Sequence, residues 1–317
     1  MKAIILKEAG SSANLYHTEL PLPEIKENEV LVKVKAISVN PIDVKARANE
    51  GVLTWIFNEE RPVILGWDIS GAVSKTGSQL SDFKIGDEVF GMVNFFGQGK
   101  AYAEYVAVPA NQLALKPADI SHEEAAAATL AALTALQVLN HAKVSKGQKV
   151  LIHAASGGVG HYAVQLAKNI GAFVIGTSSA ANKDFVLGLG ADEHIDYTSE
   201  RFEELVTDAD FVLDTMEGET LTRSIDAVKP GGMIISIPTG NFPQSDKDKA
   251  QERNVNLSEL LVKSNGRDMK TIADLLEKGI LKSHVSKTFD FKDMDKAHQS
   301  LETGRTKGKV VVTLSAD

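Results

Sequence analysis

The segment "KVLIHAASGGVGHYAVQLAK", residues 149–168, constrains the fold of this chain more than any other. It starts as an apolar strand, passes through a turn of small residues and continues as a helix. Gly157 would let the backbone approach a pyrophosphate, Gly160 would let the helix pack closely on the strand, and the helix N-terminus adds amide donors. Ala155 occupies the first fingerprint position, where a small side chain is tolerable. The segment predicts a dinucleotide-binding turn, and an ordinary tight turn is the alternative.

Strands and helices alternate after this segment up to residue 238, which predicts a parallel, doubly wound sheet. The first 120 residues contain short strands between Gly, Pro and Asn clusters and should be mostly β. Ser121 and Glu124 form a predicted capping box at the start of an alanine-rich helix. Residues 241–256 are polar and contain proline, so we expect a surface loop there. The remaining helices and strands are too few to bury a core, and should dock on the first domain or close the edge of the nucleotide-binding sheet.

The chain of 317 residues has a formal net charge of -8 and no cysteine. The acidic balance disfavours nucleic acid and anionic membranes as partners, since both require a concentrated basic face. The absence of cysteine excludes disulfides, thiolate catalysis and any zinc or iron–sulfur site with cysteine ligands. No apolar run is long enough for a membrane helix or a signal peptide. The sequence therefore predicts a cytoplasmic protein that binds neither nucleic acid nor membranes.

The choice of dinucleotide depends on the end of the second strand of the alternating region, "AFVIGTSSAANK". In an NAD site a carboxylate about 20 residues after the fingerprint binds the ribose 2'-hydroxyl. Here no acidic residue occurs before Asp184, whereas Ser178, Ser179 and Lys183 offer donors for a 2'-phosphate. The pattern favours NADPH over NADH. The alternative is a solvated loop followed by an ordinary helix cap.

Residues 147–168, "GQKVLIHAASGGVGHYAVQLAK", resemble the signature of zinc-independent NADPH:quinone oxidoreductases in the medium-chain dehydrogenase/reductase superfamily. The segments "SVNPIDVKAR", "FKIGDEVFG" and "LETGRTKGKVVV" agree with that family in the same order. The resemblance implies an α/β protein with a GroES-like, mostly β catalytic domain formed by residues 1–122 and 266–317. It also implies a Rossmann domain with a doubly wound parallel sheet at residues 123–265, NADPH bound in the cleft, and a homodimer.

The loop and the resemblance together give a set of candidate cofactor-binding residues: Asn40, Thr134, Ser156, Gly157, Gly158, Val159, Ser178, Ser179, Lys183, Tyr197, Pro238, Thr239 and Gly240. By similarity, Asn40 and the segment 238–240 lie near the nicotinamide, and Tyr197 flanks the 2'-phosphate or the adenine. The candidate catalytic residues are Asn40, Asp43 and Tyr102. Tyr102 could donate a proton to the acceptor oxygen or be a half-buried strand tyrosine. Asp43 could orient the Asn40 loop or satisfy turn amides.

Zinc-dependent members of the superfamily carry a cysteine in the first domain and a Gly-His-Glu motif near residue 66. This chain has Ser38 and Asn40 in the first region and Trp67 and Asp68 in the second. A tetrahedral zinc site cannot be built from those positions, so we expect no metal. Trp67 should fill the space of the zinc site. None of the histidines is assigned a role: His153 and His161 lack partner ligands, and His122, His141 and His298 are expected on solvated helix faces.

These observations predict an NADPH-dependent, metal-free oxidoreductase that transfers a hydride to a quinone or an α,β-unsaturated carbonyl compound. One alternative is an enoyl-thioester reductase, which requires a basic entrance for the coenzyme phosphate, for example from Lys45, Arg47 and Arg61. The other is a non-enzymatic nucleotide-binding protein, crystallin-like or RNA-binding, although the acidic balance argues against RNA.

Overall fold

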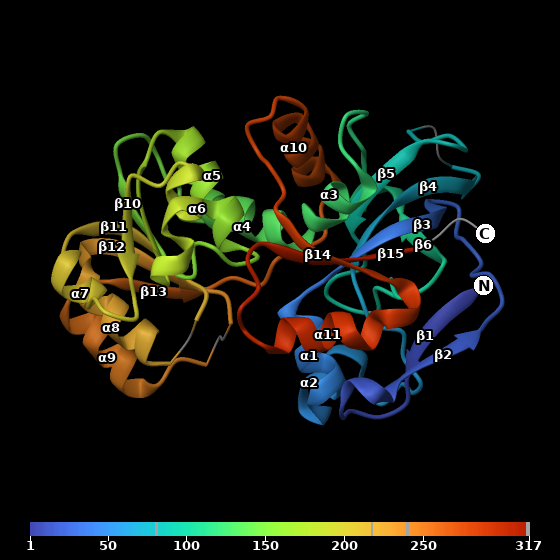
Figure 1. The fold of residues 1–317 in the computed structure, drawn as a ribbon, viewed down its shortest axis with the longest axis horizontal. Helices are drawn as coiled ribbons and strands as arrows, with labels where there is room; N and C mark the ends of the chain where they lie inside the picture. Colours follow the sequence, from blue (N-terminus) through green and yellow to red (C-terminus); the bar gives the residue numbers. More distant parts are fainter. Residues whose placement is uncertain (80–81, 217, 239–240, 315–317) are drawn as a thin grey trace. The chain divides into compact units, whose positions relative to one another are not determined.

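The computed structural model describes residues 1–79, 82–216, 218–238 and 241–314. The chain forms two compact units, one of Met1–Leu133 with Lys263–Asp317 and the other of Thr134–Val262 (Figure 1). The first boundary falls eleven residues later than the sequence indicated, after residue 133 instead of 122. The reason is that α3 (His122–Ala127) packs against strands of the first unit through three buried alanines. The second boundary falls before Lys263 instead of residue 266.

The first unit is built on an antiparallel sheet with one parallel pair at its edge. Its strands are β3 (Glu29–Val39), β4 (Asp68–Thr76), β5 (Glu88–Met92), β6 (Tyr105–Pro109), β7 (Ala114–Leu115), β14 (Val285–Asp290) and β15 (Lys309–Thr313). The order is β14-β15-β3-β4-β5-β7, and β6 pairs with β3. β1 (Lys2–Leu6) and β2 (Leu15–Glu19) form a separate antiparallel pair.

The C-terminal segment completes this sheet. β15 pairs with β3 in the register Val310↔Val39 to Thr313↔Ala36, and β14 pairs with β15 in parallel. Two docking places were possible for this segment, and in the structure it docks on the first domain. The helices of the unit are α1 (Pro41–Ala48), α2 (Glu50–Phe57), α3, α10 (Gly266–Glu277) and α11 (Met294–Glu302).

The predicted capping box at Ser121 is confirmed. The Glu124 amide donates to Ser121 Oγ at 3.1 Å, and the Ser121 amide donates to Glu124 Oε2 at 3.1 Å. Two amides that have no partner within the helix are thereby satisfied at the start of α3.

The second unit has a six-stranded parallel sheet in the order β10-β9-β8-β11-β12-β13. Its strands are β8 (Lys149–Ile152), β9 (Phe173–Ser178), β10 (Glu193–Asp196), β11 (Ala209–Asp214), β12 (Val228–Ser236) and β13 (Asn256–Glu259). This is the order of a doubly wound dinucleotide-binding sheet, in which ligands bind outside the carboxyl ends of the strands.

Helices cover both faces of this sheet, with α5 and α6 on one face and α8 and α9 on the other (Figure 1). They are α5 (Gly160–Ile170), α6 (Lys183–Gly188), α7 (Phe202–Leu205), α8 (Glu219–Ala227) and α9 (Gln244–Glu252), and α4 (Leu130–His141) crosses the unit boundary. Leu151, Val212 and Ile234 from three neighbouring strands are buried in one cluster with Leu221 and Ile225 of α8. Apolar residues on both faces explain why the strands read as continuous apolar runs.

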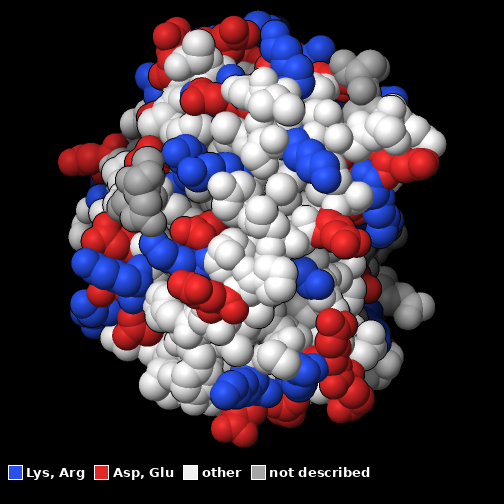
Figure 2. Space-filling model, turned by 90° about the vertical axis from the view of Figure 1, so that its right-hand side faces the viewer, with Lys and Arg blue, Asp and Glu red and all other residues white. Residues whose placement is uncertain are grey.

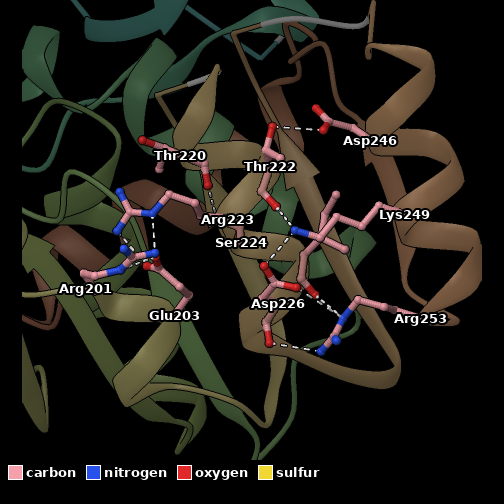
Figure 3. Close-up of polar contacts among 11 residues, drawn as sticks. Arg201, Glu203, Thr220, Thr222, Arg223, Ser224, Asp226, Asp246, Lys249 and Arg253 are labelled. Atoms are coloured by element: carbon pink, nitrogen blue, oxygen red, sulfur yellow. Dashed lines mark hydrogen bonds and ion pairs between the residues drawn. The ribbon is translucent and has the colours of Figure 1, made fainter.

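The prediction of a surface loop at residues 241–256 is wrong, because most of that segment forms α9. Asp246 is buried and accepts a hydrogen bond from Thr222 Oγ1 at 2.9 Å, and Lys249 Nζ contacts Asp226 at 2.7 Å (Figure 3). Ala250 is the buried apolar contact of the helix. The helix is held mainly by polar contacts with α8, which an apolar periodicity does not reveal. None of the helices in the described part of the chain is long and apolar enough to cross a membrane.

Candidate functional site

The turn between β8 and α5 has the geometry of a phosphate-binding loop. The Gly157 amide donates to the Ala154 carbonyl at 2.8 Å, which closes the turn. A Cβ atom at Gly160 would lie 2.2 Å from the same carbonyl oxygen, so only glycine allows α5 to approach the loop this closely. Val159 at the start of the helix makes no side-chain cap. Within the first turn of α5, the His161 and Tyr162 amides donate to the Gly157 and Val159 carbonyls at 3.1 Å. What the start of α5 offers to an anion is therefore the Gly160 amide and the positive end of the helix dipole.

Ala155 fits the first fingerprint position because a glycine lies opposite it on the neighbouring strand. Ala155 is fully buried, and its amide donates to the Thr177 carbonyl of β9 at 2.8 Å. A Cβ atom at Gly176 would lie 2.8 Å from the Ala155 methyl. The left-handed backbone that favours glycine occurs one residue earlier, at Ala154 with φ 46°. The space that the fingerprint glycine usually provides is supplied here by Gly176.

The donors proposed for a 2'-phosphate lie at the end of β9 and the start of α6. Ser178 is buried and its Oγ lies 2.7 Å from His194 Nε2 of β10. Lys183 is exposed at the first position of α6. Asn182 Nδ2 donates to Ser156 Oγ at 3.2 Å, which links this region to the phosphate loop.

His194 and Asn182 were missed by the sequence analysis. His194 is brought there by the parallel pairing of β10 with β9, in which it is opposite Gly176. Burial and the Lys183 ammonium lower the pKa of His194, so the imidazole is neutral at neutral pH. The sequence signal for His194 is its place on the third strand of the alternating region, opposite Gly176 of the second. Nothing in the residue pattern singles out Asn182.

A carboxylate does lie next to this region, on the strand that follows. Asp196 of β10 pairs with Ser178 in the sheet register. Its oxygens accept hydrogen bonds from Thr198 Oγ1 at 2.7 Å and Ser199 Oγ at 2.9 Å. These bonds lower the pKa of Asp196. The Asp196 carboxylate is thus hydrogen-bonded to residues of the turn that follows it.

The other cofactor candidates of the second unit lie on α4 and beyond the strand ends. Thr134 is buried on α4, Tyr197 is 62 % exposed just after β10, and Pro238 is half-buried after β12. Thr239 and Gly240 lie outside the described residues. His153, at the end of β8, is buried between Thr177 Oγ1 at 3.1 Å and Ser224 Oγ at 2.9 Å, and burial lowers its pKa to about 3. It is a neutral residue of the core.

The three catalytic candidates lie together in a buried polar cluster of the first unit. The Asn40 amide N–H donates to Asp43 Oδ2 at 2.7 Å, and Asn40 Nδ2 donates to Asp68 Oδ2 at 2.8 Å. Lys309 Nζ donates to Asn40 Oδ1 and lies 3.9 Å from Asp68 Oδ2. Asp68 Oδ1 accepts the Leu130 amide at 2.9 Å. Both polar atoms of the Asn40 side chain are thereby used within the cluster.

Tyr102 lies next to Asp43 of this cluster and contacts His298 on α11. The Tyr102 hydroxyl lies 2.8 Å from His298 Nε2, and both side chains are fully buried. Burial and the Asp43 carboxylate raise the pKa of Tyr102 well above its usual value. Burial, and then the Arg47 guanidinium, lower the pKa of His298 to about 3. His298 is therefore neutral.

The prediction that His298 lies on a solvated helix face is wrong. His298 lies on the same face of α11 as Met294 and Ala297, and all three are buried. The spacing of four residues from Met294 was a usable signal for this. His122 is also partly covered, with Nδ1 2.8 Å from Ser70 Oγ, whereas His141 is exposed as expected.

Two carboxylates share this buried cluster with one ammonium. Burial, and then the negative charge of Asp68, raise the pKa of Asp43 to about 7. Asp43 Oδ1 is buried and has no hydrogen-bond partner among the described residues. Burial also raises the pKa of Asp68, but Lys309 and the Asn40 amide oppose that effect. Asp43 is thus the carboxyl that holds a proton most readily.

Comparison with known proteins identifies the family. Models of the alcohol dehydrogenase GroES-like domain and of the zinc-binding dehydrogenase match residues 26–118 and 189–312. The 2-methylene-furan-3-one reductase of Solanum lycopersicum is 35% identical, over 98% of this chain and 79% of that protein. The chloroplastic NADPH-dependent alkenal/one oxidoreductase of Arabidopsis thaliana is 34% identical over the same shares. The structure of the quinone oxidoreductase from Coxiella burnetii has a TM-score of 0.93, 37% identity and 99% coverage of both chains.

The chain belongs to the quinone oxidoreductase-like family of medium-chain dehydrogenases/reductases. The expected fold is confirmed, with a GroES-like first unit and a Rossmann sheet in the second. Trp67, which the resemblance places where zinc-dependent members have histidine, is fully buried. Its ring packs on Phe57 and Phe95, with centroids at 6.1 and 5.3 Å. Over the residues that the structure describes, no three His, Cys, Asp or Glu side chains are placed to hold a metal ion.

Replacing Gly160 by alanine should lower the free energy of unfolding by roughly 1–3 kcal/mol, because the methyl group would collide with the Ala154 carbonyl. Gly188→Ala is the matched control, since a Cβ atom at this α6 position meets nothing within 4 Å. The control should leave stability unchanged or raise it by about 0.4–1 kcal/mol. Urea unfolding followed by circular dichroism measures both, and equal stability of the two variants would contradict the close approach.

Asp43→Asn should remove a pH dependence of stability. Between pH 3.8 and about 7 the folded wild type retains a proton that the unfolded chain has lost. Its free energy of unfolding therefore falls with rising pH by at most ~1.4 kcal/mol per pH unit from this group. The asparagine variant lacks this effect, so its stability relative to wild type should rise with pH up to about 7 and then level off. Exposed Asp119→Asn is the control. Parallel curves for Asp43→Asn and wild type would refute the raised pKa.

Proposed function

We propose that this chain is an NADPH-dependent reductase of quinones and α,β-unsaturated carbonyl compounds. The observation that carries the proposal is the uncapped N-terminus of α5 behind the Ser156–Val159 turn, in a sheet with the strand order of a dinucleotide-binding domain. The names of the relatives add the reaction class: a furanone reductase, an alkenal/one oxidoreductase and a quinone oxidoreductase.

The residues of the second unit fit NADPH. The Ser156–Val159 turn and the Gly160 amide at the start of α5 would hold the pyrophosphate, and Ser178, Ser179 and Lys183 would hold the 2'-phosphate. His194 and Asn182 orient this region through Ser178 and Ser156. Tyr197 would flank the adenine, and Thr134 and the segment 238–240 would contact the cofactor further along. When bound, NADPH supplies a hydride.

We propose further that the reaction needs no zinc. The chain has no cysteine, and the Asp68 oxygens are engaged by Asn40, the Leu130 amide and Lys309. A quinone or conjugated enone suits such a site, because the negative charge that develops on it spreads onto an oxygen that hydrogen bonds can stabilise. An unactivated alcohol would require a Lewis acid.

Asn40, Asp43 and Tyr102 are proposed to act by positioning the segment around residue 40. Their side chains are at most 1 % exposed, so they act through the backbone that they fix. The Asp43 carboxylate accepts a hydrogen bond from the Asn40 backbone amide. Tyr102 lies next to Asp43 and His298. The Asn40 side chain is bonded to both Asp68 and Lys309. This network determines where the loop after β3 lies.

The two alternative functions receive less support. Of the cations considered for a thioester entrance, Arg47 is buried against Glu302 and the Gly10 carbonyl, and Arg61 contacts Glu50 at 2.5 Å. On the face drawn in Figure 2, basic and acidic side chains are interspersed, whereas binding of RNA requires a continuous basic surface. The homodimer and the cytoplasmic location stay predictions.

Consumption of NADPH should be followed by its absorbance with a panel of quinones, enals, enones and enoyl thioesters. We expect turnover with quinones and enones and none with simple alcohols plus NADP. Failure to bind NADPH would rule out the proposal. Binding of NADPH without turnover of any acceptor, together with retardation of RNA at physiological salt, would instead support the non-enzymatic alternative.

Lys183→Ala should weaken NADPH binding about tenfold and leave NADH binding unchanged, since the ammonium is proposed to contact the 2'-phosphate and no other part of the nucleotide. Lys247→Ala, an exposed lysine on α9 of the same unit, is the matched control and should affect neither nucleotide. Titration of nucleotide fluorescence measures both constants. If Lys183→Ala weakened the two nucleotides equally, Lys183 would not discriminate between them, while the reductase assignment would stand.

A further inference from the structure

Two large aromatic rings lie exposed and next to one another on the first unit. Trp55 of α2 is 57 % exposed and Phe96, in the segment between β5 and β6, is 41 % exposed. Their ring centroids are 4.4 Å apart and the ring planes meet at 55°. Two such rings form an apolar corner, and apolar surface of this kind on a folded domain commonly marks a binding site.

This corner is the outer end of a row of rings that runs into the core. Phe96 contacts Phe95 at 5.7 Å, Phe95 contacts Trp67 at 5.3 Å, and Trp67 stacks on Phe57 at 6.1 Å, measured between centroids.

Trp67, the third ring of this row, lies next to the buried polar cluster. Trp67 precedes Asp68, which binds the Asn40 side chain. Gly66, on the other side of Trp67, lies so close to the Tyr102 ring that a Cβ atom there would be 2.4 Å from it. The exposed rings are therefore connected, within one unit, to the residues that position the Asn40 loop.

The segment that carries Phe96 is held in place by hydrogen bonds. Trp67 Nε1 donates to the Gly97 carbonyl at 2.7 Å, and the Asn94 amide donates to Gln112 Oε1 at 2.7 Å. The Phe95 amide donates to Ser264 Oγ at 3.0 Å, and Gln98 contacts Glu60 just beyond α2. A ring on a segment fixed in this way, such as Phe96, loses little freedom when a ligand binds, which favours affinity.

We propose that Trp55 and Phe96 bind the planar ring system of the acceptor, so that this chain prefers aromatic quinones and aryl enones to short alkenals. The inference rests on the proposed function. A flat conjugated ring can stack on one of the two rings while its edge meets the other. A short enal has no ring to place there, so it gains nothing from the corner.

The test compares Trp55→Leu and Phe96→Leu with wild type, using 1,4-naphthoquinone and propenal as acceptors with NADPH. We expect kcat/KM for naphthoquinone to fall roughly tenfold, mainly through KM, and kcat/KM for propenal to change less than about twofold. Trp55→Phe keeps a ring at this position and should restore most of the naphthoquinone activity. Tyr16→Leu removes another exposed ring, on β2, and should change neither value.

The outcomes separate this inference from the proposed function. If wild type reduces both acceptors and the leucine variants lose both activities equally, or lose neither, the corner does not bind the acceptor while the reductase assignment stands. If the leucine variants convert a dimeric wild type to monomer in size-exclusion chromatography, the corner is an interface between copies and the inference is wrong. If wild type reduces no acceptor at all, the proposed function fails first and the inference falls with it.

Discussion

The buried pairing of Lys309 with Asp68, with Asn40 bonded to both, joins three segments that are far apart in the sequence. They are the end of β3, the start of β4 and the start of β15. A buried charge that loses its partner costs several kcal/mol, so a strand that carries a buried lysine has few registers in which it can pair. The pairing Val310↔Val39 is one that brings Lys309 to the polar cluster. The docking of the C-terminal segment and the position of the Asn40 loop thus depend on the same contact.

The charge balance of this cluster follows from its burial. Asp43 and Asp68 are both fully buried, and Lys309 is the ammonium within reach of Asp68 at 3.9 Å. One cation can compensate one carboxylate, so the second carboxyl is more stable with a proton. The pKa of Asp43 is raised to about 7 because its carboxyl is buried and lies near the negative charge of Asp68. Arg47, whose guanidinium is paired with Glu302, acts on the other side of the cluster, where it lowers the pKa of His298.

The sequence was sufficient for the alternation of strands and helices, the Ser121 capping box and the tight turn between β8 and α5, because each depends on residues close together in the chain. It was not sufficient for α9, whose contacts are the polar ones of Asp246 and Lys249 with α8. His298 was misplaced because histidine was assumed to be solvated, although its face of α11 carries Met294 and Ala297. Contacts between distant segments, such as Tyr102 with His298, depend on how the elements pack, which local periodicity does not encode.

The phosphate turn shows why a motif defined by glycines alone understates what the fold requires. Both α5 and β9 must pack closely against the turn. This close packing requires small residues at the points of contact, and those residues need not occupy one fixed position in the sequence. Gly160 satisfies it on the helix side, where a Cβ atom would meet the Ala154 carbonyl. On the strand side Gly176 satisfies it, and its missing side chain leaves the space that the Ala155 methyl fills. Alanine at the first fingerprint position is therefore accommodated here by the glycine next to it on the second strand, and the two positions should be considered together.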